Sequence, residues 1–287
     1  MQCDEGFAYG PIADIPASCD LADELWERKM TYFDDEAARR MEAMYATQGM
    51  VYRRRAVVDA LQVEAGQRVI DIGTGSGFVA YDIADAIGAA GEVVGVDLSE
   101  SMMRLGRLRC ADKPWVRFEM GEATQLPFPD GAFDVAVSVQ VYEYVREVGA
   151  ALAEMFRVLR PGGRGAIVST DWKSIVWHSS DAKRMEKILA AYAEHCVYAD
   201  LPRTLGVKLK SAGFNISHEA VITQYHRNND PSVYSHYLID RIRSFAPGRQ
   251  GVSGQDAADW AKDLQQIGER GGYFFCLNQF LFVVVKP

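Results

Sequence analysis

The chain has 287 residues, room for one catalytic domain with added segments, and its 48% apolar and 24% charged content is typical of a globular protein. A formal net charge of −8 would repel a phosphate backbone, which argues against nucleic acid as a partner. No apolar stretch approaches the ~18 residues needed to cross a bilayer, and the acidic first residues do not resemble a secretory leader, so we expect a cytoplasmic protein without a membrane partner.

Residues 1–62 are expected to form a helical N-terminal extension, because apolar residues recur at three- and four-residue spacing in its second half. Residues 63–172 then alternate short apolar runs with helical patterns. Strands are predicted at 68–72, 92–97, 115–119, 133–139 and 165–170, with helices beginning near Ser76, Ser99 and Glu147. Such alternation implies right-handed crossovers and a parallel sheet covered on both faces, so the fold class is doubly wound α/β.

Residues 173–287 follow a different pattern, which predicts substrate-pocket helices plus the final strands of the sheet. Helical stretches are expected at 181–196 and 203–212, a strand at 214–225, and mixed irregular and helical sequence through residue 268. The apolar run 279–285 reads as a buried last strand.

Three glycines, Gly73, Gly75 and Gly77, stand between a predicted strand and a predicted helix, where a tight turn lets backbone approach a nucleotide-like ligand. A dinucleotide loop is the competing reading, and the acidic residue expected further on, Asp97, fits both. However, a dinucleotide loop that starts at Gly73 would have its third glycine where Phe78 stands. Asp71 would also repel a pyrophosphate. The loop therefore favours a zwitterionic sulfonium, and an NAD(P)-dependent oxidoreductase is the less favoured alternative.

Five ordered segments (69–77, 95–102, 121–128, 133–138 and 157–163) resemble the motif series of class I S-adenosylmethionine-dependent methyltransferases. Two of these motifs, Leu-Pro-Phe at 126–128 and Arg-Val-Leu-Arg-Pro-Gly-Gly at 157–163, are most similar to those of the ubiquinone/menaquinone C-methyltransferase-like (methyltransferase type 11) group. The resemblance covers about residues 50 to 170. It implies a Rossmann-like methyltransferase fold with a seven-stranded, mostly parallel sheet, a last strand at 280–285 inserted antiparallel, and C-terminal insertions that form a lid over the substrate.

The resemblance also implies which residues hold S-adenosylmethionine and its product S-adenosylhomocysteine. Asp97 would accept hydrogen bonds from the ribose hydroxyls, and Glu122, where the family usually has aspartate, would hold the adenine amino group. Leu98 and Met102 either sandwich the adenine or pack in the core. The expected cofactor-binding residues are Asp71, Gly73, Thr74, Gly75, Gly77, Asp97, Leu98, Met102, Gly121, Glu122, Ala123 and Gln140.

The acceptor side carries no comparable motif, so its residues are inferred from their position after the fourth and fifth strands. His178 is the first candidate for a general base, and the hydroxyl of Tyr142 either faces the acceptor or caps a packed ring. The expected substrate-binding residues are Asp171, Trp172, Trp177, Arg203, Asn228 and Phe274. Further candidates are His195 and His226, and Tyr45, Thr47, Tyr52 and Arg53 lie where related enzymes fold a helix over the cofactor.

The sequence thus predicts a transferase that moves a methyl group, by in-line displacement, to a carbon, oxygen, nitrogen or sulfur nucleophile of a small molecule in cofactor or secondary metabolism. A non-catalytic subunit that only binds S-adenosylmethionine remains an alternative. Five scattered cysteines without a Cys-x-x-Cys pair argue against a zinc site and against arsenite methylation, and we expect no metal. We expect a monomer or a homodimer.

Overall fold

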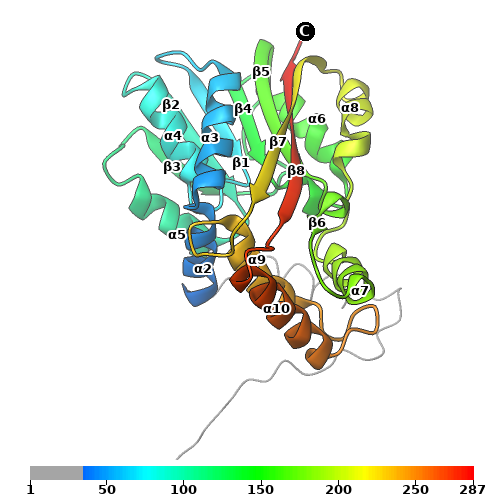
Figure 1. Ribbon diagram of the computed structural model, residues 1–287. Helices are drawn as coiled ribbons and strands as arrows, with labels where there is room; N and C mark the ends of the chain where they lie inside the picture. Colours follow the sequence, from blue (N-terminus) through cyan, green and yellow to red (C-terminus); the bar gives the residue numbers. More distant parts are fainter. Residues whose placement is uncertain (1–34) are drawn as a thin grey trace, which may run out of the picture.

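The computed structural model describes residues 35–287, so the part of the predicted extension before residue 35 lies outside the described residues. Its centre is one sheet with the strand order β3-β2-β1-β4-β5-β8, to which β6 and β7 are added along β8 (Figure 1). The strands are β1 (Arg68–Ile72), β2 (Glu92–Asp97), β3 (Val116–Met120), β4 (Phe133–Val139), β5 (Leu159–Thr170), β6 (Val176–Trp177), β7 (Asn215–His226) and β8 (Phe275–Val285). Strands β1 to β5 pair in parallel, which confirms the predicted α/β class.

Strand β8 lies antiparallel between β5 and β7, as the resemblance implied. Its register joins Thr170 to Gln279 on one side and His226 to Phe275 on the other. Because β8 begins before the residue that faces the end of β5, its first residues extend past that end, and the two-residue strand β6 pairs with them there. This short pairing is the strand that the seven-stranded expectation did not contain.

Helices cover both faces of the sheet. On one face lie α3 (Gln48–Leu61), α4 (Phe78–Ile87) and α5 (Glu100–Arg109), and on the other lie α6 (Val148–Val158) and α8 (Pro202–Ser211) (Figure 1). The side chain of Ser99 accepts a hydrogen bond from the backbone N–H of Met102 and so caps α5 at the predicted position. These two faces position the strand ends, where the loops leave the sheet.

A cap of further helices gathers beyond the carboxyl ends of the parallel strands, at the lower end of the sheet in Figure 1. It consists of α2 (Asp35–Tyr45), α7 (Ala182–Ala193), α9 (Tyr234–Phe245) and α10 (Gly254–Glu269), joined by one apolar cluster that contains Trp177, Trp260 and Tyr273. Ser253 and Asp256 begin α10 with a reciprocal pair of side-chain to backbone hydrogen bonds. The cap therefore covers the edge at which open α/β sheets bind ligands.

Strand β5 begins six residues earlier than the predicted start at Gly165, at Leu159. This first part of β5 pairs with the end of the chain, where Gly162 N–H donates to Lys286 O (2.9 Å) and Lys286 N–H donates to Gly163 O (2.8 Å). Within residues 35–287, no helix is long and apolar enough to cross a membrane.

Candidate functional site

The glycine loop after β1 approaches the rest of the protein closely at one position and leaves another open. A Cβ on Gly73 would lie 2.2 Å from Val141 Cγ2, so this glycine packs directly against the residue that follows Gln140. A Cβ on Gly75 would meet only the flexible Cε of Met102, at 3.6 Å. Both glycines have positive φ, 72° and 53°. The loop thus rests on the protein through Gly73 and presents open backbone at Gly75, as close approach to a ligand requires.

Asp97, at the end of β2, is held by the same loop. Its Oδ2 accepts the N–H of Gly75 (2.8 Å) and its Oδ1 accepts the N–H of Ser99 (2.9 Å). A carboxylate offers about four acceptor positions, so each oxygen keeps one for a ligand. Burial raises the pKa of Asp97, and the hydrogen bonds from Ser99 and Gly75 partly oppose that rise. The group is therefore oriented, and its two free acceptor positions suit a vicinal diol.

The predicted adenine contacts lie beside Asp97. Leu98 is 45% exposed, whereas Met102 is buried, so only Leu98 presents its side chain openly. Gly121 N–H donates to Asp97 O (3.2 Å), which ties the third motif to the second strand. Glu122 is exposed and accepts a hydrogen bond from the Thr124 hydroxyl. Leu98 and Glu122 are thus both exposed on segments that adjoin Asp97, and Ala123 is partly buried.

Asp71 lies beneath the glycine loop and does not face the space above it. Its side chain is 1% exposed and accepts a hydrogen bond from the Thr74 hydroxyl (2.7 Å). Burial raises the pKa of Asp71 to about 7. Asp71 would therefore repel a pyrophosphate less than the sequence suggested, because its carboxyl is covered and readily holds a proton. Any part that Asp71 and Thr74 have in ligand binding is exerted through the shape of the loop.

Gln140 follows β4 with a left-handed backbone (φ 58°), and its side chain connects α3 to the sheet. Its Oε1 accepts a hydrogen bond from Arg53 on α3, and its Nε2 donates to the Thr170 hydroxyl (2.8 Å). The same hydroxyl accepts a hydrogen bond from Gln279 on β8 (3.2 Å). Four elements therefore meet in one buried polar network at the carboxyl edge. A left-handed φ is strained for a residue with a side chain, and such strain is common at ligand sites.

Glu143, which the sequence analysis did not single out, is fully buried next to this network. It accepts hydrogen bonds from the N–H of Thr170 (3.1 Å) and from the Ser169 hydroxyl (3.3 Å). Burial raises the pKa of Glu143 to about 7, and the charge of Arg53 acts in the opposite direction. Because both oxygens are engaged, this side chain fixes the segment after β4 to the end of β5. The only sequence signal for it is a charged residue in an apolar context.

Two of the expected substrate residues form an ion pair, since Arg203 Nε donates to Asp171 Oδ2 (2.9 Å). Trp172 and Trp177 are both buried, but in different surroundings. The Trp172 ring lies edge-on to Tyr192 and His195, with ring centroids 5.7 and 4.6 Å apart. Trp177 packs in the interior of the cap, against Trp260 and Phe275. Of the two indoles, only Trp172 lies directly after β5, at the carboxyl edge.

The two residues expected to be catalytic do not meet at this edge. Tyr142 is 1% exposed, and its hydroxyl points to Met155 Sδ (3.4 Å) on α6, so it caps a packed ring in the core. Burial raises the pKa of that hydroxyl above its usual value. His178 is exposed just after β6, and its backbone N–H donates to Phe274 O (3.0 Å). These placements do not support a catalytic role for Tyr142, and the His178 side chain forms no hydrogen bond or ion pair with another residue of 35–287.

The remaining expected residues, Asn228, Phe274 and His226, differ in exposure. Asn228 is exposed and donates to Asp230 Oδ2 (2.6 Å), and Phe274 packs against the exposed ring of Tyr225. His226 is buried, stacks on Phe275 and pairs with the Ser235 hydroxyl (2.9 Å), and burial lowers its pKa to about 4. In the described part of the chain, no group of three or more His, Cys, Asp and Glu residues could hold a metal ion.

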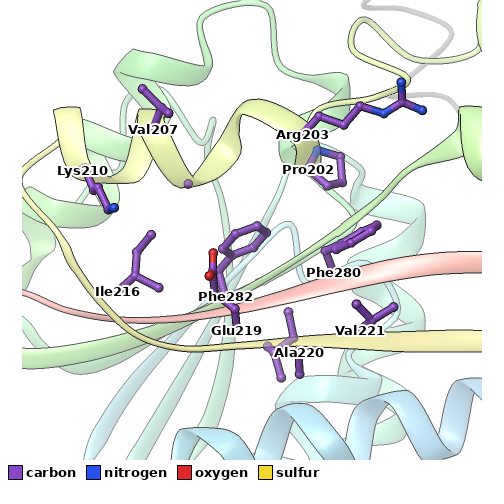
Figure 2. A pocket seen from close by; sticks show the side chains of 12 residues that line it. Pro202, Arg203, Val207, Lys210, Ile216, Glu219, Ala220, Val221, Phe280 and Phe282 are labelled. Atoms are coloured by element: carbon purple, nitrogen blue, oxygen red, sulfur yellow. The ribbon is translucent and has the colours of Figure 1, made fainter.

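A hollow of about 680 Å³ opens elsewhere, between α8 and strands β7 and β8. Figure 2 shows the rings of Phe280 and Phe282 below the helix, with Lys210 at one end and Arg203 at the other. It lies on the face of the sheet, away from the glycine loop and Asp97. None of the residues that line it belongs to β1, to β2 or to the loops that follow these strands.

Residues 70–167 match the family described as a methyltransferase domain. The chain is 34% identical over 142 residues to an uncharacterized 37.1 kDa protein of transposon TN4556 from Streptomyces fradiae, covering 50% of this chain and 40% of that protein. It is 40% identical over 114 residues to a ubiquinone/menaquinone biosynthesis C-methyltransferase of Yersinia enterocolitica, covering 39% of this chain and 45% of the relative.

These matches span less than half of the length of either relative. Among solved structures, phosphoethanolamine N-methyltransferase 2 of Haemonchus contortus, in complex with S-adenosyl-L-methionine, is similar with a TM-score of 0.59 and 22% identity. That likeness covers 91% of this chain and 59% of the other. It is a likeness of fold.

Proposed function

We propose that this chain, whose residues 70–167 form a methyltransferase domain, transfers a methyl group from S-adenosylmethionine to a small-molecule acceptor. The observation that carries the proposal is the arrangement of Gly75 and Asp97. One side of the loop is open at Gly75, and the carboxylate it orients keeps two free acceptor positions. A ribose diol fits those positions, and the exposed Leu98 lies next to them.

The residues present fit the cofactor. Asp97 would hold the ribose, Leu98 and Glu122 would flank the adenine, and Gly73 and Gly75 would admit the methionine part toward Gln140. When bound, the cofactor supplies an electrophilic methyl group on a sulfonium. Held by these residues, it would give up that methyl group to the acceptor by in-line displacement, with the bonding electron pair kept by sulfur and any acceptor proton passed to solvent or to a base.

The work of this chain is therefore positioning and exclusion of water. The cap helices cover the carboxyl edge, and the network of Arg53, Gln140 and Thr170 fixes the segment after β4. Holding the two reacting atoms in line accounts for most of the rate enhancement such a reaction needs. A base is needed only for an acceptor that arrives protonated. The lack of a prepared histidine is thus compatible with the proposed activity.

A dinucleotide remains the competing ligand, and two residues, Asp71 and Phe78, were the sequence evidence against it. Asp71 does not argue against a bound pyrophosphate, because its carboxyl is buried beneath the loop. Phe78 does argue against a dinucleotide, because it stands where a dinucleotide loop would have a glycine. Its ring is flanked by the guanidinium groups of Arg54 (4.5 Å) and Arg109 (3.4 Å). That position is built around a side chain, which supports the sulfonium cofactor.

The test is calorimetric titration of the full chain with S-adenosylmethionine, S-adenosylhomocysteine and NAD. We expect both sulfur ligands to bind and NAD not to bind. Absence of binding by either sulfur ligand, or preference for NAD, would refute the proposal. If the sulfur ligands bind but methyl-labelled cofactor gives no labelled product with metabolite extracts, the non-catalytic subunit becomes the better explanation.

A further inference from the structure

A partly buried arginine, Arg241 on α9, lies in the cap and forms no ion pair with any residue of the described part of the chain. No carboxylate among the described residues lies within ion-pair distance of it, and its recorded hydrogen bond goes to Met41 Sδ on α2 (3.1 Å). Its neighbour on the same helix, Arg243, is more exposed and pairs with Asp240 (3.1 Å). Placing a guanidinium away from water without an opposite charge costs free energy, so a compensating group is expected near Arg241.

Four tyrosines from different elements lie within electrostatic range of Arg241. Tyr192, Tyr144, Tyr45 and Tyr234 all lie close enough to interact electrostatically with its charge. Two of the rings, Tyr45 and Tyr144, are only partly buried. Phenol rings and hydroxyls favour a cation and also offer donors to an anion that approaches it.

Several polar atoms of this cluster have no partner, although their side chains are more than nine-tenths buried. The Tyr192 hydroxyl, His195 Nε2 and Arg53 Nε all lack a hydrogen bond, and the three residues are 1, 5 and 3% exposed. The His195 ring stacks on Tyr192 (4.1 Å between centroids) and its Nδ1 is engaged by Tyr192 O (2.6 Å). Buried polar atoms are nearly always satisfied, so unsatisfied ones gathered in one place indicate a missing ligand.

This cluster adjoins the proposed cofactor site. Arg53 binds Gln140, and the next residue, Val141, touches the backbone of Gly73. Tyr144 follows in the same segment, and its ring lies 5.8 Å from that of His195. A molecule among these rings would therefore stand beside the loop that we propose holds the methyl donor.

The charges of the cluster select the chemistry of that molecule. The cluster contains two cations, Arg53 and Arg241. Among its described residues the one acid is Glu143, which interacts with Arg53. His195 is neutral, because burial lowers its pKa to about 3. Among residues 35–287, at least one positive charge, that of Arg241, is thus left without an opposite charge. A single carboxylate would balance it and would match the fork of the guanidinium.

We propose that the methyl acceptor is a small carboxylic acid with a flat apolar body, whose carboxylate pairs with Arg241 while its body lies among Tyr45, Tyr144 and Trp172. This inference rests on the proposed function, since it names the substrate class of the same site. Arg241 is a binding residue in this scheme, and the methyl group goes to another atom of the acceptor.

The experiment uses the full chain saturated with S-adenosylhomocysteine and measures the affinity for benzoate, its neutral isostere benzamide, and phenyl phosphate at constant ionic strength. Benzoate should bind at least tenfold more tightly than benzamide. Arg241→Met, which keeps an unbranched apolar stem, should bind both probes equally. Arg243→Met is the matched control on the same helix and should keep the preference for benzoate.

Binding of S-adenosylhomocysteine is measured first, so the two proposals fail separately. Loss of that binding would count against the methyltransferase proposal. With the product bound, equal affinity for benzoate and benzamide, no benzoate binding up to about 20 mM, or an unchanged preference in Arg241→Met would each overturn the carboxylate assignment. Tighter binding of phenyl phosphate than of benzoate would replace the carboxylate with a phosphate ester.

Discussion

Gly73→Ala should destabilise the fold far more than Gly75→Ala, although both glycines belong to one loop and both have positive φ. Each substitution forces a side chain into a left-handed backbone, at about 1–2 kcal/mol. Only at position 73 does the new Cβ overlap a neighbour, 2.2 Å from Val141 Cγ2, and overpacking adds about 1–3 kcal/mol. We therefore expect a loss of roughly 2 to 5 kcal/mol for Gly73→Ala and roughly 1 to 2 kcal/mol for Gly75→Ala.

Urea unfolding of the two variants measures these values, and a double-mutant cycle separates the two causes. In Gly73→Ala with Val141→Ala, the methyl groups that the new Cβ meets are gone, so the overlap should be relieved while the backbone strain remains. The cycle should give a favourable coupling of roughly 1 to 3 kcal/mol. Equal destabilisation by the two glycine substitutions, or additive effects in the cycle, would show that the close approach of Gly73 to Val141 does not govern stability.

Three further predictions concern the cofactor, pH and the cap. Asp97→Asn replaces an acceptor-only oxygen with a donor, so S-adenosylmethionine affinity by calorimetry should fall at least tenfold, and the free energy of unfolding should fall by about 1–3 kcal/mol because Gly75 or Ser99 N–H loses its acceptor; unchanged affinity would remove the ribose assignment. The pKa of Glu143 is about 7 in the fold, above its ordinary 4.5, so the folded chain keeps a proton that the unfolded chain releases, and stability is lost as pH rises from about 4.5 to 7. Relative to Glu143→Gln, the wild type should therefore lose roughly 1 kcal/mol per pH unit in urea unfolding across that window, and a difference independent of pH would contradict this. Ser253→Ala removes the cap of α10 and should cost about 1 kcal/mol while leaving cofactor affinity unchanged; a weaker affinity would show that α10 is coupled to the site.

The sequence predicted the sheet well because its signals are local. Strands β1, β2 and β4 have the predicted bounds, and Ser99 begins its helix where a capping residue should. Strand β5 was predicted too short because its first part is extended by bonds to Lys286, which is 123 residues distant from Gly163 in the chain. Such a pairing leaves no trace in the local pattern.

The acceptor side was harder to predict, for a physical reason. A pattern of polar and apolar residues cannot tell which face a side chain occupies after a strand ends. Tyr142 turned toward α6, whereas Glu143, its neighbour, became the buried link to Thr170. Arg241 looked like an ordinary charge on an amphipathic helix. Only the tertiary arrangement shows that Arg243 is paired at the surface and Arg241 is not.

The central place of β8 has a consequence for how the protein is made. The ribosome synthesises β8 after both of its neighbours, because β5 ends at Thr170 and β7 at His226, whereas β8 ends at Val285. At typical rates of translation the edge of β5 stays open for on the order of ten seconds. During that time it exposes unpaired backbone groups that other chains can join. Slow synthesis between β5 and β8 should therefore favour aggregation, and chaperones that shelter open strand edges should raise the yield of folded protein.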